Sequence, residues 1–496
     1  MNILKDYLAS MPKELNHEML TFTANIDMVA RKSPTVAKTI VKELQDQRSF
    51  LKLIASENFC SLNVQSAMGN LLTDKYAEGY VENRFYAGCD NVDDIERKAS
   101  EEAVKLFGAE HAFVQPHSGA DANLVAFWAI LRKKIQAPFM DKLNETNLLN
   151  LTKEDWDKIR TEMGNQKMLG MDLYSGGHLT HGYRHNASAQ MFDSYFYTVD
   201  KDTERLDYDA IRELLKKIRP LVFLIGFSAY TRNVDFELMK KYADEVGAVL
   251  MVDMAHFAGL VAGGVMTGTH NPIPYADIVT TTTHKTLRGP RGGMVLCKKE
   301  YAEYVDKACP HIMGGPLPHM MAAKAIAFQE ANEPEFKAYA ANIVKNAAAL
   351  GESLVANGMH ILTGGTDNHM VIVNVSGLGL TGRQAENALR ECGMTLNRNT
   401  VPFDKNGPWY TSGLRFGTPA ATSLGMGTDE MKEIGSIIAN VLKNVKPTVN
   451  KKGEASKAKY VLAPEAKEDA LKRVKKILEK FVLYPNIDTG FFAKYF

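Results

Sequence analysis

Cysteine is scarce in this chain: five of 496 residues, scattered at Cys60, Cys89, Cys297, Cys309 and Cys392. Their number is odd, and no two have Cys-x-x-Cys spacing. In a chain of this length, such a pattern argues against a disulfide framework and against a structural zinc site, and it is typical of a reducing compartment. We therefore expect the protein to be cytoplasmic.

Long apolar runs and an excess of charge of either sign are also absent. No run approaches the ~20 apolar residues that a membrane helix requires, and residues 1–7 lack the basic and apolar stretches of a signal peptide. The formal net charge is +1, and the composition is 45% hydrophobic and 24% charged. This balance is typical of a soluble globular protein and does not favour nucleic acid or a membrane as a partner.

Short apolar runs alternate with helical segments over the first two-thirds of the chain. Continuous apolar strands separated by helices indicate an α/β fold with a largely parallel sheet buried on both faces. The predicted strands are residues 112–115, 221–226, 248–253, 277–282 and 294–297. The predicted helices include residues 92–107, which Gly108 would cap, and residues 121–131, 208–218 and 236–246.

The pattern divides the chain into an arm and two domains. Residues 1–50 read as a helical arm, residues 51–335 as a large domain, and residues 336–496 as a smaller α+β domain. Residues 133–167 are polar, mixed in charge and poor in β-branched side chains, so we predict a surface insertion there. In the small domain we expect strands at 359–362, at 369–375 and near Leu414, helices at 383–391 and 464–481, and a lysine-rich loop at about 449–462.

One stretch, residues 279–293, places a single lysine among hydroxyl groups. It reads Val-Thr-Thr-Thr-Thr-His-Lys-Thr-Leu-Arg-Gly-Pro-Arg-Gly-Gly, with Lys285 just past a predicted strand. A lysine there is poorly placed for packing and well placed for covalent chemistry, because lysine amines form Schiff bases with carbonyl cofactors, above all pyridoxal phosphate. Asp253 ends an earlier predicted strand, residues 248–253, and could supply the carboxylate that keeps the cofactor ring nitrogen protonated.

Other polar clusters could complete such a site. Ser118 and Gly119 lie between a strand and a helix, where backbone N–H groups bind phosphate. Further phosphate contacts could come from Arg291 and from the glycine pairs 292–293 and 314–315, or these residues could simply make turns. Residues 176–182, Gly-Gly-His-Leu-Thr-His-Gly, offer two histidines, His178 and His181, as candidates for a flat partner of the ring. Residues 75–88 place Glu78 among tyrosines and glycines, which suits proton transfer in a shielded site.

Two competing interpretations are disfavoured. His178, His181 and His185 are close in sequence, but no His-Glu-x-x-His motif and no nearby carboxylate or cysteine accompanies them, so we expect no metal site. Residues 377–382 match Gly-x-Gly-x-x-Gly between a predicted strand and helix. They lie in the smaller domain without an evident ribose-binding acid, so we interpret them as a connecting turn.

Six strings in order closely resemble serine hydroxymethyltransferase, a family of pyridoxal-phosphate enzymes with the aspartate-aminotransferase fold. They are Leu-Ile-Ala-Ser-Glu-Asn at 53–58, Lys-Tyr-Ala-Glu-Gly-Tyr at 75–80, the histidine run at 176–182, Val-Asp-Met-Ala-His at 252–256, Thr-Thr-Thr-Thr-His-Lys-Thr at 280–286 and Arg-Phe-Gly-Thr-Pro-Ala at 415–420. The resemblance implies a three-layer sandwich around a mostly parallel sheet, pyridoxal 5'-phosphate as cofactor, and L-serine, glycine and tetrahydrofolate as reactants.

The resemblance also implies residue roles. Lys285 would be the Schiff-base lysine, Asp253 the partner of the pyridine nitrogen and His178 the residue stacked on the ring. Glu78 would be the general acid/base, contributed by a second subunit. Thr282 would be a further catalytic residue.

The remaining implied contacts make a homodimer the minimal active unit. For the cofactor they are Ser228, His256, Ser118 and Gly119, with Tyr76, Gly314 and Gly315 from the second subunit. For the substrate carboxylate they are Ser56, Tyr86, Arg415 and Arg291, and for folate they are Leu173, Gly177, Leu179, Asn399 and Phe85.

The chain departs from the family pattern at a few positions, and two other functions remain open. Ala120 replaces a serine of the phosphate turn, Phe85 replaces a tyrosine beside the folate, Met313 replaces a glutamine, and residues 183–186 differ from the usual run. A folate-independent aldolase or racemase could use the same lysine, and a regulator could bind the cofactor without catalysis. Glu78 and the folate positions argue against the first alternative, and the intact Lys285 and Asp253 against the second.

Overall fold

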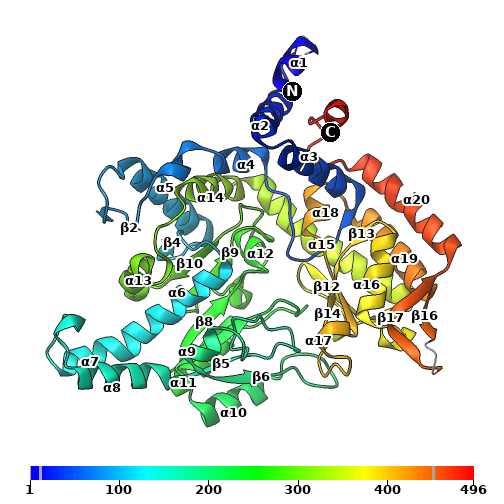
Figure 1. The fold of residues 1–496 in the computed structure, drawn as a ribbon. Coiled ribbons are helices and arrows are strands. Elements are labelled where there is room, and N and C mark those ends of the chain that lie inside the picture. The colour runs from blue at the N-terminus through cyan, green and yellow to red at the C-terminus, as the bar shows by residue number, and fades with distance from the viewer. Residues whose placement is uncertain (1, 11–13, 450–452) are drawn as a thin grey trace.

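A computed structural model describes residues 2–10, 14–449 and 453–496, and its centre is a seven-stranded sheet (Figure 1). The strand order is β4-β10-β9-β8-β7-β5-β6, and all neighbours are parallel except β10, which runs antiparallel to β4 and β9. The strands are β4 (His111–Phe113), β5 (Lys167–Met171), β6 (Asp193–Tyr197), β7 (Val222–Gly226), β8 (Val249–Asp253), β9 (Ile278–Thr282) and β10 (Gly293–Cys297).

Apolar side chains on both faces of the strands explain the three layers. Along β7, Val222 and Leu224 pack with α6 (Gly119–Leu131) and α13 (Lys299–Asp306) in one core. Phe223 and Ile225 point the other way, into a core with α5 (Asp90–Phe107), α10 (Tyr208–Ile218), α11 (Phe236–Val246), α12 (Ala258–Ala262) and α14 (Pro318–Ala331). Each face is therefore covered by helices, which confirms the predicted sandwich.

A second core lies around a four-stranded sheet of order β11-β12-β15-β14. Its strands are β11 (His360–Ile361), β12 (Met370–Asn374), β14 (Asn397–Asn399) and β15 (Gly413–Gly417), covered by α15 (Pro334–Ala356), α16 (Gly382–Glu391), α19 (Thr428–Lys443) and α20 (Pro464–Lys480). Leu51 and Leu53 also pack here, because β1 (Leu51–Lys52) pairs in parallel with β13 (Met394–Thr395). The Gly-x-Gly-x-x-Gly run forms the turn between β12 and α16, as predicted.

The lysine-rich segment was wrongly predicted as a loop. Residues 455–462 form β17 (Ala455–Leu462), which pairs with β16 (Val445–Val449); residues 450–452 of the predicted loop lie outside the described residues. Exposed and half-buried residues alternate along β17, so polar side chains can face outward while the strand stays paired. The Gln384 amide donates to the carbonyls of Ser456 and Lys459 and holds the strand against α16.

The helical insertion projects from the large sheet. It comprises a π-helical turn at Arg132–Gln136, α7 (Ala137–Lys142), a short turn at Leu148–Asn150 and α8 (Lys153–Gly164), and Figure 1 shows α7 and α8 extending away from the strands. These elements make up most of the segment predicted as a surface insertion. None of the helices in the described ranges is both long and apolar enough to cross a membrane.

The N-terminal arm and the C-terminal tail share a small core of their own. The helices α1 (Ile3–Ser10), α2 (His17–Lys32) and α3 (Pro34–Ser49) pack against Leu483, Ile487 and Phe492. Arg48 at the end of α3 donates to the carbonyls of Leu483, Tyr484 and Ile487 at 2.8, 2.6 and 2.9 Å. The Arg48 guanidinium therefore ties the tail to the arm, together with Asn16 Nδ2, which donates to the Asn486 carbonyl at 2.7 Å.

Replacing Arg48 should loosen the tail without unfolding either domain. Arg48→Met removes three charge-assisted hydrogen bonds, which we expect to cost about 2 kcal/mol of local stability and to speed amide hydrogen exchange at residues 483–492 by roughly 30-fold. Lys38→Met, an exposed position on the same helix, is the matched control and should leave exchange unchanged. Equal exchange in both variants would contradict this role of Arg48.

Candidate active site

One group of the predicted site residues lies at one edge of the central sheet. Asp253 ends β8, Thr282 ends β9 and Lys285 follows three residues later, while Ser228 lies just beyond β7. The carboxyl ends of parallel strands meet at one edge, which is where open α/β sheets bind ligands. Ser118 caps the first turn of α6 beside them.

Asp253 is a buried carboxylate that is kept charged by its neighbours. Its Oδ2 accepts from Asn123 Nδ2 at 2.9 Å and from His181 Nε2 at 3.1 Å, and its Oδ1 accepts from the Ala255 N–H at 3.0 Å. Burial alone would raise the pKa of Asp253, but the hydrogen bonds from His181 and Asn123 and the neighbouring His181 and His178 imidazoles hold this pKa well below its ordinary value. The side chain can therefore remain an anion at the end of a strand.

A hydrogen-bond network fixes the proton positions on both histidines. The backbone N–H of His178 donates to His181 Nδ1 at 3.2 Å, so the proton on His181 is at Nε2, facing Asp253. The backbone N–H of Thr180 donates to His178 Nδ1. Burial lowers the pKa of His178 to about 4, although the Asp253 carboxylate opposes this shift. His178 is therefore a neutral imidazole at physiological pH.

Lys285 has the electrostatic setting of a reactive amine. Burial lowers its pKa from 10.5 to about 8; Asp253 acts to raise the pKa, while Arg415 and Arg291 lower it further. A substantial fraction of the amine is then neutral, hence nucleophilic, near physiological pH.

The backbone around Lys285 is clamped from two directions. Asn58 Nδ2 donates to the Lys285 carbonyl at 2.8 Å, and Tyr339 Oη donates to the carbonyl of Thr286 at 3.2 Å. Ser423, on α18 (Pro419–Ser423), donates to Asn58 Oδ1 at 2.7 Å. The loop carrying the lysine is thus held both by the string at 53–58 and by a helix that follows β15.

The turn at Ser118 and Gly119 packs closely against neighbouring strands. A Cβ at Gly119 would lie 2.7 Å from Thr282 Cγ2, and a Cβ at Gly293 would lie 2.1 Å from the Ser118 carbonyl oxygen. Glycine leaves the space that the Thr282 side chain needs beside residue 119 and that the Ser118 backbone needs beside residue 293. Ala120, where the resemblance leads one to expect serine, is an exposed residue of the first turn of α6.

Arg415 reaches across from the small sheet. It lies on β15, where its Nε donates to Asn397 Oδ1 at 3.0 Å and its Nη1 donates to the Ser228 carbonyl. Within the described ranges its Nη2 donates to no protein group, so one side of the guanidinium fork is available for a carboxylate. Ser56 belongs to the segment that runs beside the end of β15, where a Cβ at Gly417 would lie 2.3 Å from the Ala55 Cα.

Two buried histidines lie stacked between the two sheets. The rings of His256 and His369 have centroids 5.5 Å apart at an interplanar angle of 23°, and His256 Nδ1 is 3.3 Å from His369 Nε2. Burial lowers the pKa of His256 well below its ordinary value and that of His369 to about 3, so both are neutral.

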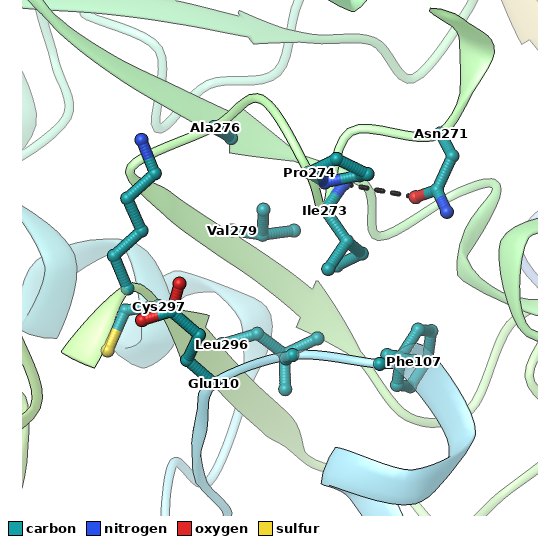
Figure 2. Close-up of a pocket in the computed structure, with 12 residues that line it drawn as sticks. Phe107, Glu110, Asn271, Ile273, Pro274, Ala276, Val279, Leu296 and Cys297 are labelled. Carbon is teal, nitrogen blue, oxygen red and sulfur yellow. Dashed lines mark hydrogen bonds between the residues drawn. The ribbon is translucent and has the colours of Figure 1, made fainter. Parts of the chain in front are cut away.

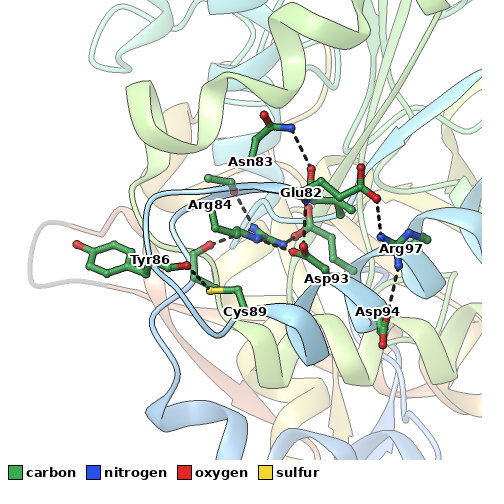
Figure 3. Close-up of polar contacts among 12 residues, drawn as sticks. Glu82, Asn83, Arg84, Tyr86, Cys89, Asp93, Asp94 and Arg97 are labelled. Carbon is green, nitrogen blue, oxygen red and sulfur yellow. Dashed lines mark hydrogen bonds and ion pairs between the residues drawn. The ribbon is translucent and has the colours of Figure 1, made fainter.

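A second group of predicted residues flanks a short ribbon formed by β2 (Gly79–Tyr80) and β3 (Asn83–Arg84). The Arg84 side chain donates to the carbonyls of Ala77 and Gly79 at 3.0 and 2.8 Å, on either side of Glu78, and pairs with Asp93 and Glu96 (Figure 3). The Glu78 carbonyl in turn accepts from the Phe85 N–H at 3.0 Å. Hydrogen bonds from Arg84 and Phe85 of the same chain therefore fix the main chain on either side of Glu78.

This ribbon also contacts the segment that carries Gly314 and Gly315. The Tyr76 ring lies beside Gly315, at 3.3 Å from an idealised Cβ there, and against Tyr86, with centroids 4.8 Å apart. Tyr76, Phe85 and Tyr86 are about half exposed or more, at 56%, 69% and 48%. Among the described residues, no hydrogen bond or ion pair joins these candidates to those around Lys285, so the predicted residues form two clusters.

The predicted folate residues are divided in the same way. Leu173, Gly177 and Leu179 lie in the loop after β5, and Leu179 is 46% exposed. Asn399 ends β14, whereas Phe85 lies on the ribbon. Among the described residues, no hydrogen bond joins Phe85 to the other four.

A separate pocket of about 190 Å³ lies at the other edge of the sheet (Figure 2). Phe107, Glu110, Val279 and Cys297 line it where β9 begins and β10 ends, so it contains none of the predicted residues. The part of the chain that the structure describes holds no group of three or more His, Cys, Asp or Glu residues suited to a metal ion.

Sequence reasoning missed Asn123, Asn58 and His369, and left His181 without an assigned role. Asn123 comes one helical turn after Gly119, which is a usable signal because such a residue faces the sheet. Asn58 and His181 were within the recognised strings. His369 precedes β12, and no pattern in the sequence singles it out.

Comparison with known proteins identifies the same family along nearly the whole chain. The family model for serine hydroxymethyltransferase matches residues 29–146 and 161–438. The unmatched residues 147–160 lie inside the segment that was predicted as an insertion.

Curated relatives are similar over almost their full length. A serine hydroxymethyltransferase from Treponema pallidum is 55% identical over 494 residues, which cover 99% of this chain and 86% of the relative. Those from Salinispora tropica and Chlamydia muridarum are each 52% identical, over 96% and 95% of this chain and 99% and 95% of the relative.

The titration of Lys285 can be measured directly in cofactor-free protein. Because only the neutral amine reacts, labelling of Lys285 by a small amine reagent should rise with pH and reach half its maximum near pH 8. Asp253→Asn should move this midpoint to lower pH, because the carboxylate charge that favours the ammonium form is lost. Peptide mass spectrometry gives the labelled fraction. A midpoint near 10 in the unmodified chain would rule out the lowered pKa.

Proposed function

The chain belongs to the serine hydroxymethyltransferase family, and on this premise we propose which of its residues carry out the reaction. The protein is a pyridoxal-phosphate-dependent enzyme that reversibly transfers the hydroxymethyl carbon of serine to tetrahydrofolate, giving glycine and 5,10-methylenetetrahydrofolate. The family alone does not assign individual residues in this chain. The single observation that supports the assignment best is Asp253, a buried anion beside a neutral His178 and a Lys285 of lowered pKa.

The residues around Asp253 fit pyridoxal phosphate. When bound, this cofactor supplies a carbonyl carbon for covalent attachment and a ring that accepts electrons. Lys285 would attach it, the Asp253 carboxylate would keep a proton on the ring nitrogen, and neutral His178 would lie against the ring face. Ser118 and Gly119 would donate to the phosphate at the start of α6. Ser228, His256 and Thr282 would complete the surroundings of the cofactor.

The substrate carboxylate would bind to Arg415, with Ser56 beside it. The free side of the Arg415 guanidinium matches a carboxylate in geometry and charge, and burial strengthens the interaction by excluding water. Fixing the carboxylate fixes the orientation of the substrate side chain, so that the bond to be broken is aligned. Arg291, which is exposed, would add positive charge at the entrance.

The proton carrier would come from a second subunit. Glu78 would move a proton at the side-chain oxygen of the substrate, and Tyr76, Tyr86, Gly314 and Gly315 would accompany it. The exposed aromatic rings on a rigid ribbon, separate from Lys285, support a homodimer with shared sites. Leu173, Gly177, Leu179 and Asn399 of one subunit and Phe85 of the other would then enclose the folate. The five free cysteines are consistent with a cytoplasmic location, which we also propose.

Turnover should depend on Lys285 and on tetrahydrofolate. We expect the purified protein to be yellow, and Lys285→Ala to remain folded but to lose serine-to-glycine conversion. The assay compares this conversion with and without tetrahydrofolate. Full activity of Lys285→Ala would overturn the lysine assignment, and equal rates without folate would favour the aldolase alternative.

Mixing two inactive variants tests whether the site is shared. A dimer of one Glu78→Gln subunit and one Lys285→Ala subunit contains one site with both residues intact if Glu78 acts across the interface. Random mixing should then restore roughly a quarter of the unmodified activity. If Glu78 acts within its own subunit, mixed dimers contain no intact site, and activity stays at the level of the separate variants.

A further inference from the structure

Lys324 is a buried lysine that the proposed reaction does not use. It lies in the middle of α14 with 1% of its surface exposed. Its Nζ donates to three backbone carbonyls, those of Val114, Pro116 and Gly293, at 2.5, 2.9 and 2.9 Å. Among the described residues no carboxylate forms an ion pair with it. A fully buried lysine without such a pair is uncommon.

The three carbonyls belong to two chain segments that meet at the proposed phosphate turn. Val114 and Pro116 lie on the segment leading from β4 to Ser118 and Gly119. Gly293 begins β10, and its N–H donates to the Pro116 carbonyl at 2.9 Å. The lysine ammonium therefore binds both segments where they approach the start of α6.

The surrounding backbone leaves space for the Lys324 side chain. A Cβ at Gly292 would lie 2.6 Å from Lys324 Cε and 3.0 Å from its Nζ, so glycine at 292 leaves the space that the lysine occupies. Burial lowers the pKa of Lys324 to about 7, although the charges of Glu96 and Asp121 act to raise it. The amine is therefore partly neutral near physiological pH, and a phosphate dianion bound nearby would raise this pKa and favour the ammonium form.

We propose that Lys324 is a positioning residue for the cofactor phosphate: its ammonium holds the turn before Ser118 in place and adds positive charge beneath the anion. This inference rests on the proposed position of the phosphate at Ser118 and Gly119. Three neutral carbonyls orient the ammonium without neutralising it, unlike a carboxylate partner, so its charge remains available to attract a phosphate.

The test compares two ligands that differ only in the phosphate group. The full-length protein is freed of cofactor and titrated with pyridoxal phosphate and with pyridoxal, and the absorbance of the lysine adduct gives each Kd. We expect Lys324→Met to raise the Kd for pyridoxal phosphate by about tenfold or more and that for pyridoxal by less than about threefold. Lys337→Met, an exposed position on α15, is the control and should change neither.

Two further variants make every outcome informative. Gly292→Ala pushes on the lysine stem and should reduce the preference for pyridoxal phosphate over pyridoxal even if Lys324→Met fails to fold. If neither Lys324→Met nor Gly292→Ala changes this preference but Ser118→Ala does, Lys324 has no role and the phosphate position stands. If none of the three changes it, the phosphate position itself is wrong, and the inference is overturned with it.

Discussion

The centre of this structure depends on keeping one buried carboxylate ionised. A charge at the end of β8 is costly unless donors surround it, and three do: the amide of Asn123, the imidazole of His181 and the backbone N–H of Ala255. Each comes from a different part of the chain, so the charge can be stabilised only when α6, the loop after β5 and the end of β8 are assembled. The same negative charge acts on His178 and Lys285, and it thereby links the electrostatics of the whole site.

Side-chain donors hold the backbone of the loops that carry the proposed catalytic residues. Asn58 and Tyr339 hold the carbonyls next to Lys285, Arg84 holds those on either side of Glu78, and Lys324 holds those leading to Ser118. In all three places a side chain donates to main-chain carbonyls of a loop. Loops are otherwise the most mobile part of a fold, and these donors give them the precision that a preorganised site requires.

The two-cluster arrangement explains why the chain carries exposed aromatic residues on a rigid ribbon. Tyr76 and Phe85 are costly to leave in water, yet the ribbon that carries them is held by buried ion pairs of Arg84. A surface that is both apolar and rigid is typical of an interface. The proposed homodimer therefore gives one explanation for two observations. These are the exposure of the aromatic rings and the absence, among the described residues, of a hydrogen bond or ion pair between the cluster of Glu78 and that of Lys285.

Much of the fold and the site could be predicted because it follows from local pattern. The strands β7, β8 and β9 are continuous apolar runs, and Asp253 and Lys285 stand at their carboxyl ends. Prediction failed where the pattern is weak: β5 reads Lys-Met-Leu-Gly-Met without a β-branched residue, and β6 is an edge strand that begins with Asp193 and Ser194. Both strands form because their neighbours supply hydrogen bonds, which no local preference reveals.

The sequence by itself determined the family and the chemistry and led to the proposal for the central residues, because these depend on residue types at fixed spacings along short strings. Only the tertiary structure decided which residues contact one another. The contact of Asn123 with Asp253 and the contacts of Lys324 with three carbonyls join segments far apart in the chain. Such contacts depend on the packing of helices against the sheet, and spacing along the sequence carries no information about them.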